Sequence, residues 1–475
     1  MNSNHYFSNA GQLFKALLKG EFKEQTQGNF FYSKTDVGIC SAHNILGLPV
    51  VITQWNPNFK KKVYFCGLPL FTQSRKALWA DQGEQYRIDN DRKPRLYIHI
   101  GGLPYFDNRS GIPRVSKKLT EEGLKNPDVD VLPVYPNPRD GTYRIALSWI
   151  KQMGYTDPQM NGLDETNLES DPVMTIREGD WFIHSMINPN ELEFEHRKLQ
   201  AMRDVGVKVG FILYDIIAER SPNYFKKRDA KTFSRWLRMI DHFDGIFAIS
   251  ETVLNDYQSW RQEQNLPALN CPVKWFHLGA DFKKVQGRLS ANDEEQLAKI
   301  RQHDYYLQVS TIEPRKGYRQ LLDAFDCLWN EDSDLAVVFV GRKGWKVNDL
   351  CRRIKKHPQL HKKLFWLSGV SDEFLTTLYS NAKGVIVASE NEGFGLSVAE
   401  GVFYGKPLLV RDIPVFREVA KEAGSYFRGY TGEDLAIAIK KIDSSIPLVR
   451  KGKLALNDVQ MPTWTECFES FYKLL

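Results

Sequence analysis

The sequence predicts an α/β fold in which parallel sheets carry helices on both faces. Short apolar runs rich in β-branched residues, such as residues 384–388, are typical of strands buried on both sides. These runs alternate along the chain with helical segments, and that alternation implies parallel strands joined by right-handed crossovers. The chain has 475 residues, which is long enough for two or three such domains.

Composition excludes several classes of protein. The hydrophobic content of 42% fits a soluble globular protein, and no apolar run is long enough to span a bilayer. Residues 1–8 are polar and lack the pattern of a signal peptide, so a cytoplasmic location is predicted. The net charge of +6 suits anionic substrates or an anionic membrane surface and is too small to indicate nucleic acid. The six cysteines are scattered without a Cys-x-x-Cys pair, so they indicate neither a zinc site nor a disulfide framework.

Residues 1–93 differ from the rest of the chain and are predicted to form an accessory region. Residues 12–22 fit a short amphipathic helix, and residues 60–71 fit a hairpin with a glycine at its turn. The basic and apolar side chains of that hairpin suit a peripheral contact with an anionic membrane. A small layer packed on the next domain is the favoured interpretation. Residues 82–93 are predicted to be a charged linker.

Residues 95–102 read as the first strand of a Rossmann-like domain. A helix is expected to follow, with Ser110 as its N-cap and Pro113 in its first turn, and to run to about Lys125. Further strands are predicted at 129–135, 181–186, 207–214 and 246–249, with helices at 191–203 and 230–242. The long polar stretch 137–179 interrupts this pattern and is interpreted as an acceptor-side insertion.

A second domain is predicted to begin with a strand at 305–311. The strand is followed by a turn that Pro314 stiffens, and two adjacent cations, Arg315 and Lys316, then enter a helix. A guanidinium can hold two phosphate oxygens at once, and an ammonium adds a point charge. This segment therefore predicts a site for a phosphate group.

Residues 384–404 combine a strand, a glycine-bearing loop and the start of a helix. Gly393 and Gly395 allow a sharp turn and the close approach of a ligand, and the first amides of the helix suit an anion. Gly405 and Pro407 close the helix. Glu392 in the loop and Glu400 in the helix can each accept two hydroxyl groups of a sugar or a ribose. Amides for phosphate and carboxylates for hydroxyls together indicate a nucleotide-sugar site.

Glu392-Gly393-Phe394-Gly395-Leu396, followed by Glu400, resembles the signature of the retaining glycosyltransferases of family 4. The likeness covers about residues 95–475 and implies the GT-B fold, in which two Rossmann-like, doubly wound parallel-sheet domains face a cleft. Ser397 and Gly401 depart from the pattern, because the family usually has proline and alanine at these positions. The implied domains are 94–285 on the acceptor side, 286–455 for the nucleotide sugar, and a helix in 456–475 that returns to the first domain.

The resemblance also implies a role for each matching residue. Gly111 and Ile112 would place amides against the donor diphosphate, and Arg315 and Lys316 would hold the leaving diphosphate together with the backbone of residues 393–396, including Phe394. Glu392 would hold sugar hydroxyls, Glu400 the ribose, and the backbone at Val370 the base. Asp215 lies in a matching segment in which Tyr214 replaces a common histidine. It is expected either to orient the acceptor or to cap the next helix, with equal weight.

The reaction implied by the resemblance is transfer of a hexosyl group from a nucleoside diphosphate sugar to a hydroxyl, with retention of configuration. Because the departing phosphate would take the acceptor proton, no side-chain base is required. The resemblance also implies neither a metal nor another cofactor. Likeness to mannosyl- and rhamnosyltransferase-like enzymes of lipopolysaccharide and capsule assembly favours GDP-mannose as donor. The expected acceptor is a glycan or lipid-linked glycan at the inner face of the cytoplasmic membrane.

Other functions were weighed against this interpretation. Three Asp-x-Asp patterns, at 89–91, 128–130 and 332–334, could hold the metal of a GT-A enzyme, but none ends a strand beside other site residues. Glu392 and Glu400 could be the paired carboxylates of a retaining glycosidase. That chemistry would not need the cations Arg315 and Lys316. A non-catalytic GT-B homologue and a nucleotide-sugar epimerase stay open as alternatives.

Overall fold

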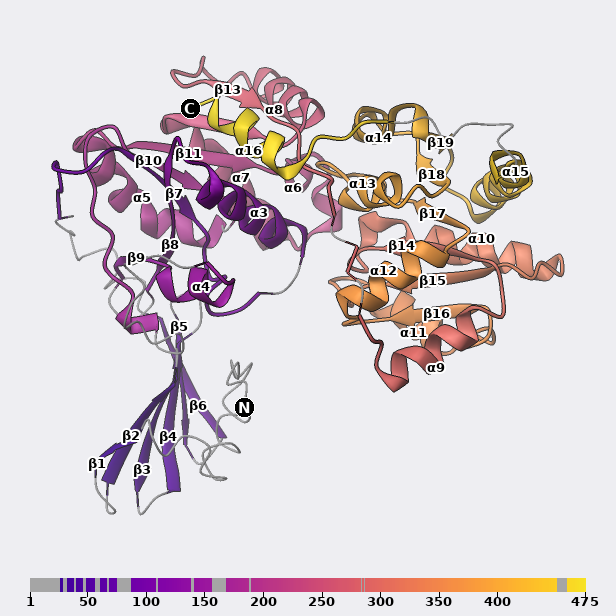
Figure 1. Cartoon of the computed structure of the whole chain (residues 1–475), viewed down its shortest axis with the longest axis horizontal. Helices are drawn as coiled ribbons and strands as arrows, with labels where there is room; N and C mark the ends of the chain where they lie inside the picture. Colours follow the sequence, from indigo (N-terminus) through magenta and orange to yellow (C-terminus); the bar gives the residue numbers. More distant parts are fainter. Residues whose placement is uncertain are drawn as a thin grey trace.

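The structure is a computed structural model. It describes the strand backbone between Thr26 and Ser74, and residues 87–475 with gaps at 108–109, 138–140, 156–167, 188, 283, 286 and 451–458. The predicted α/β class is confirmed, because this part of the chain contains two sheets built mainly of parallel strands, with helices packed on them (Figure 1). No helix among the described residues has the length and apolar character needed to cross a membrane.

The first parallel sheet has the strand order β13-β12-β11-β10-β7-β8-β9. Its strands are β7 (Arg95–His99), β8 (Asp130–Pro136), β9 (Tyr143–Ile145), β10 (Trp181–His184), β11 (Lys208–Leu213), β12 (Gly245–Ala248) and β13 (Val273–Trp275). Its helices are α3 (Gly111–Lys125), α4 (Leu147–Gln152), α5 (Pro189–Asp204), α6 (Ile217–Arg220), α7 (Lys227–Met239) and α8 (Glu251–Glu263). The five strands predicted from the sequence are all present. The order reverses between β7 and β10, and open α/β sheets bind ligands at such a switch point.

The second parallel sheet has the order β16-β15-β14-β17-β18-β19. Its strands are β14 (Tyr305–Val309), β15 (Ala336–Val340), β16 (Leu364–Leu367), β17 (Gly384–Val387), β18 (Leu408–Arg411) and β19 (Gly424–Phe427). Its helices are α9 (Ala291–Ile300), α10 (Tyr318–Asn330), α11 (Asn348–Lys355), α12 (Asp372–Asn381), α13 (Leu396–Phe403), α14 (Pro414–Ala420) and α15 (Gly432–Arg450). Every residue of β15 and β17 is buried, which explains their continuous apolar sequence. The strand order reverses between β14 and β17.

The segment 137–179 is not the long irregular insertion that its polar composition suggested. Within its described part, β9 pairs antiparallel with β8 at the edge of the first sheet, and α4 follows. The signal was weak because β9 is short, and its buried aromatic residue, Tyr143, is flanked by polar residues. An acceptor-side role for this segment stays a prediction.

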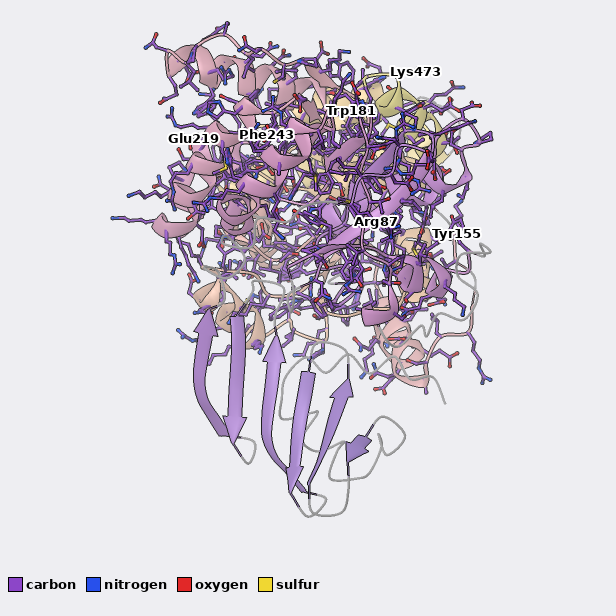
Figure 2. The ribbon with its side chains drawn as sticks, turned by 90° about the vertical axis from the view of Figure 1, so that its left-hand side faces the viewer. Arg87, Tyr155, Trp181, Glu219, Phe243 and Lys473 are labelled. Atoms are coloured by element: carbon purple, nitrogen blue, oxygen red, sulfur yellow. The ribbon has the colours of Figure 1, made fainter. Side chains whose placement is uncertain are left out.

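The accessory region contains a six-stranded antiparallel sheet in the order β1 to β6. Its strands are β1 (Thr26–Gly28), β2 (Tyr32–Val37), β3 (Cys40–Ile45), β4 (Leu48–Trp55), β5 (Lys60–Phe65) and β6 (Leu68–Ser74). The predicted hairpin at 60–71 is confirmed as β5 and β6. Both figures show this sheet extending away from the first parallel-sheet domain (Figure 1, Figure 2). The helix predicted at 12–22 lies outside the described residues.

The final helix, α16 (Trp464–Tyr472), lies beside α3 of the first domain (Figure 1). Thr463 and Glu466 form a reciprocal capping box at its start. Gly279 approaches Trp464 so closely that a Cβ there would lie 2.5 Å from the tryptophan backbone. The Asp281 carboxylate accepts a hydrogen bond from the Trp464 amide, so the segment at the end of the first domain anchors the last helix.

Candidate active site

Two loops of the second domain meet where its strand order reverses. One follows β14 and carries Arg315 and Lys316, and the other follows β17 and carries Glu392 and Gly393. Gly317 has a left-handed backbone with a φ of 70°, and a Cβ there would lie 2.2 Å from the Ala388 carbonyl oxygen. The Glu390 amide donates to the Arg315 carbonyl oxygen at 2.7 Å. Glycine and backbone hydrogen bonding therefore hold the two loops together.

Glu392 stands between the two predicted phosphate-binding cations. Its carboxylate accepts from Arg315 Nη1 at 3.0 Å and from Lys316 Nζ at 2.5 Å. Arg315 Nη1 also donates to the Asn391 carbonyl oxygen at 2.8 Å. The cations lie in a single 3-10 turn, Pro314–Lys316, and do not enter the helix as the sequence suggested, because Gly317 ends that turn before α10 begins.

The charges in this cluster set its titration behaviour. Burial alone would raise the pKa of Glu392, but Lys316 and Arg315 outweigh burial and hold that pKa at about 2. Burial and the neighbouring Arg315 lower the pKa of Lys316. Burial raises the pKa of the nearby Glu313. A fixed anion with two fixed cations is suited to stabilising charge that develops on a bound diphosphate and to accepting hydroxyl groups.

Asp215 lies at the carboxyl end of β11 in the first domain, within the electrostatic reach of Arg315, Glu392 and Lys316. Its Oδ1 accepts from the Ile217 amide at 2.9 Å, so it fixes the first turn of α6, as one of the two predicted alternatives states. Burial raises its pKa. The role in orienting an acceptor stays a prediction.

The glycine loop makes close contacts with the first domain. A Cβ at Gly393 would lie 1.8 Å from the Tyr214 carbonyl oxygen, and Ser250 Oγ donates to the Gly393 carbonyl oxygen at 2.7 Å. Gly395 has a φ of 90° and occupies the N-cap of α13. Phe394 is buried, and its ring makes a T-shaped contact with the His277 ring, with centroids 4.8 Å apart. Only the backbone of Phe394 is therefore available to a ligand.

The predicted donor loops of the two domains face each other. A Cβ at Gly111 would lie 3.6 Å from Leu396 Cδ1, so the start of α3 and the start of α13 are in contact range. Ser110 occupies the N-cap of α3 but its side chain makes no capping hydrogen bond. Ile112 is half-buried and packs against the core, so only its backbone faces an incoming ligand.

Glu400 is buried and binds two partners. It accepts from Tyr379 Oη of α12 and from Arg114 Nη1 of α3. These residues line a cavity of 730 Å³ between the domains. Tyr379 stacks on Tyr404 with ring centroids 4.7 Å apart. Val370 lies outside that lining, half-buried just before Ser371, which caps α12.

Several residues at the cleft could not be identified by sequence reasoning. Tyr214 does not substitute for the common histidine, because its buried hydroxyl donates to the Ser185 carbonyl oxygen at 2.7 Å, inside the first domain. Glu418 of α14 accepts from the Glu251 amide at 2.8 Å and from the Thr252 hydroxyl at 2.6 Å, where α8 begins. Trp345 donates to the Tyr224 carbonyl oxygen at 2.8 Å. No local pattern pairs Glu418 with the start of α8, because more than 160 residues separate the two segments.

Comparisons with known proteins agree with this geometry. Residues 290–445 match the family model described as glycosyl transferases group 1. Over 355 residues the chain is 34% identical to the serotype-specific mannosyltransferase WbdA of Escherichia coli, covering 73% of this chain and 42% of that protein. It is also 28% identical over 154 residues to the O-antigen chain mannosyltransferase RfbU of Salmonella typhimurium, covering 32% of this chain and 42% of that protein. The chain thus spans less than half the length of these relatives.

Solved structures share the fold at low sequence identity. Sucrose-phosphate synthase from Thermosynechococcus elongatus matches with a TM-score of 0.56 and 16% identity, covering 81% of this chain and 98% of that one. HepE of Anabaena, solved in complex with UDP and glucose, matches with a TM-score of 0.53 and 13% identity. That match covers 80% of this chain and 99% of HepE. The solved structures show that the chain has the GT-B fold, and residues 290–445 resemble the glycosyl transferases of group 1. In sequence the chain is similar to a serotype-specific mannosyltransferase and an O-antigen chain mannosyltransferase.

Proposed function

We propose that the protein is a retaining glycosyltransferase that moves a mannosyl group from GDP-mannose to a hydroxyl of a growing surface polysaccharide. The observation that carries this proposal is the cluster in which Glu392 binds both Arg315 and Lys316, at the point where the two domains meet. The mannosyltransferase names of the relatives favour mannose over other hexoses.

Each part of the cluster has a proposed task. Arg315, Lys316 and the amides at Gly111 and Leu396 would bind the diphosphate and stabilise the negative charge that it gains as the glycosidic bond breaks. Glu392 would accept hydroxyls of the sugar. The departing phosphate would take the acceptor proton, so the transfer itself needs no metal or side-chain base.

The remaining assignments complete the proposal. Glu400 would accept the ribose hydroxyls at the 730 Å³ cavity. Arg114 would have to move so that the Glu400 carboxylate can accept from the arginine and the ribose together. The backbone at Val370 would lie towards the base, and Asp215 would face the acceptor. The acceptor would be a lipid-linked or growing glycan, reached from the cytoplasmic side by a protein held peripherally at the membrane.

The test is a transfer assay followed by NMR of the product. Purified protein is incubated with a synthetic mannoside acceptor in four parallel reactions. Each reaction contains one donor: GDP-mannose, UDP-glucose, UDP-N-acetylglucosamine or dTDP-rhamnose. The proposal expects product with GDP-mannose, with an α-linkage that keeps the donor's configuration, and loss of turnover in Glu392→Gln. A β-linked product would overturn retention, and isomerised donor without transfer would indicate an epimerase. Binding of a donor without turnover would support the non-catalytic alternative.

A further inference from the structure

A buried group of three side chains lies outside the proposed active site. His99 ends β7 and His184 ends β10, and these residues are direct neighbours in the parallel register of the two strands. Glu195 of α5 reaches the same point. The exposed fractions of the three residues are 0%, 1% and 0%. They lie at the carboxyl ends of the strands between which the first sheet reverses its order.

Both ring nitrogens of His184 lie beside hydrogen-bond acceptors, although a neutral imidazole has only one N–H to donate. Its Nδ1 lies 2.8 Å from the Met186 carbonyl oxygen, and because a carbonyl can only accept, Nδ1 carries the hydrogen. Nε2 of the neutral ring then carries a lone pair, yet it lies 3.0 Å from Glu195 Oε2, which is also an acceptor. A positive charge must stand between these two atoms, either as a proton or as a metal ion.

His99 distinguishes these two alternatives. Neither of its ring nitrogens has a hydrogen-bond partner among the described residues, and Nε2 is 3.8 Å from Glu195 Oε1, too far for a hydrogen bond. Leaving a buried polar group without a partner is costly. The ring of His99 is fully buried, and a neutral imidazole has one nitrogen lone pair that can bind a metal ion. A proton on His184 would leave both ring nitrogens of His99 without a partner, whereas one metal ion would bind His184, Glu195 and the lone pair of one His99 nitrogen.

We propose that His99, His184 and Glu195 bind a divalent transition-metal ion, with Zn²⁺ the best match. Their ligand atoms all lie within 4.8 Å of one another. A tetrahedral Zn²⁺ with bonds of about 2.0–2.1 Å needs ligand atoms roughly 3.3 Å apart. His184 Nε2 lies 3.0 Å from Glu195 Oε2, and His99 Nε2 lies 3.8 Å from the other oxygen, Oε1, so a small rotation of the carboxylate would suit either histidine. Two imidazoles and one carboxylate are ligands that suit Zn²⁺.

Groups around the three ligands are placed as supporting partners of a metal site. The Met186 carbonyl oxygen accepts from Nδ1 of His184 and fixes the tautomer that presents Nε2 to the ion. Tyr143 Oη donates to Glu195 Oε1 at 2.9 Å and orients the carboxylate. The rings of Phe182 and Phe211 stack on the two histidines at centroid distances of 5.7 and 5.3 Å. This apolar shell lowers the local dielectric, which strengthens an ion's hold on its ligands.

The position indicates a structural ion. Ser185, between His184 and Met186, accepts from the Tyr214 hydroxyl through its carbonyl oxygen. The carbonyl of Tyr214 in turn abuts Gly393 of the glycine loop. An ion at His184 would therefore fix the end of β10 and the wall of the cleft against which the second domain closes. Since it is buried inside the first domain, it does not replace the metal-independent chemistry proposed for the donor.

The experiment measures the metal content of the 475-residue chain. The chain is stripped with a chelator, loaded with Zn²⁺, desalted and analysed by elemental mass spectrometry. The variants are His99→Gln and His184→Gln, and the matched control is His196→Gln, which removes a half-buried histidine directly after Glu195 on the same helix. The proposal expects one Zn²⁺ per chain in the wild type and the control, and at least a fivefold lower content in the two ligand variants. Equal content in all four proteins, or no retained Zn²⁺ in the wild type, would overturn it.

A second measurement keeps the proposal testable if the ligand variants do not fold. Co²⁺ is loaded into the stripped wild-type protein and its visible spectrum is recorded. The proposal expects the d–d bands of a low-coordinate Co²⁺ bound to nitrogen and oxygen, without a thiolate charge-transfer band. A thiolate band would place the ion at cysteines, and the spectrum of hydrated Co²⁺ would show that no site exists. Either result would contradict the assignment to His99, His184 and Glu195.

Discussion

Arg114 of α3 and Glu400 of α13 form a hydrogen-bonded ion pair across the cleft, although 286 residues separate them in the sequence. The Glu400 carboxylate is nearly buried, and Arg114 is about one-third exposed to the 730 Å³ cavity. The pair thus links the first domain to the residue proposed to bind the ribose, so under that proposal domain closure and donor binding would depend on each other.

We expect Arg114→Ala to raise the KM for the donor about tenfold with a smaller change in kcat, because Glu400 loses the partner that positions it. A tenfold change corresponds to about 1.4 kcal/mol, below the roughly 2–5 kcal/mol for a fully buried pair, because the Arg114 side chain is partly exposed. Steady-state kinetics measure both parameters. Lys117→Ala is the matched control, since Lys117 lines the same cavity, and it should stay within twofold of the wild type. An unchanged KM in Arg114→Ala would show that the ion pair does not serve the donor site.

Glu392→Gln should lower kcat by at least a hundredfold, because the amide cannot replace a charged acceptor between Arg315 and Lys316. It should also destabilise the fold by about 3 kcal/mol, because two neighbouring buried cations lose their counter-charge. Turnover assays and urea unfolding test the two effects. Retained turnover with a clear loss of stability would mean that Glu392 is structural only.

Stability should fall on acidification as Glu392 takes up a proton. Its pKa is about 2 in the folded chain, below the value of about 4.3 for an unfolded chain, so the stabilisation is complete above about pH 4.3 and is lost as pH falls towards 2. The contribution is on the order of 2–3 kcal/mol. Urea unfolding at pH 6, 4 and 3 should show a smaller acid loss in Glu392→Gln than in the wild type.

Glu295→Gln is the control for that titration, because Glu295 is an exposed carboxylate paired with Lys299 and should leave the acid loss unchanged. If Glu392→Gln and the wild type lose equal stability in acid, the pKa of Glu392 is not lowered by its cationic partners.

Gly393→Ala should keep the domains from closing, since the new Cβ would lie 1.8 Å from the Tyr214 carbonyl oxygen of the first domain. Opening the cleft relieves this clash, so we expect at least a hundredfold loss of kcat/KM with a melting temperature within a few degrees of the wild type. Small-angle X-ray scattering should report a larger radius of gyration. If the variant is closed and active, the close contact between Gly393 and the Tyr214 carbonyl oxygen is not required for catalysis.

The parts of the fold that follow from local sequence were predictable. Strands such as β15 and β17 carry continuous apolar runs because both faces are covered. The loop before α13 could be recognised from its glycine residues. Strand β9 was missed because three residues carry too little periodicity to be recognised.

The candidate site was predicted less completely, because its contacts join distant segments. Glu392, Arg315 and Lys316 were identified separately, but their mutual ion pairs depend on how β14 and β17 lie side by side. Nothing local in the sequence identifies Glu400 as the partner of Arg114, because the two residues are 286 positions apart. The cluster of His99, His184 and Glu195 escaped notice for the same reason, since no metal-binding spacing joins them in the sequence.

The central claim is that Arg315 and Lys316 hold the diphosphate of the donor, and calorimetric binding tests it most directly. Wild type, Arg315→Ala and Lys316→Ala are titrated with GDP and with guanosine, which lacks the phosphates. The account predicts that each variant loses at least tenfold in affinity for GDP, with guanosine binding unchanged. If GDP binds all three proteins equally, or if guanosine binding falls to the same extent, the assignment of these cations to the diphosphate is wrong.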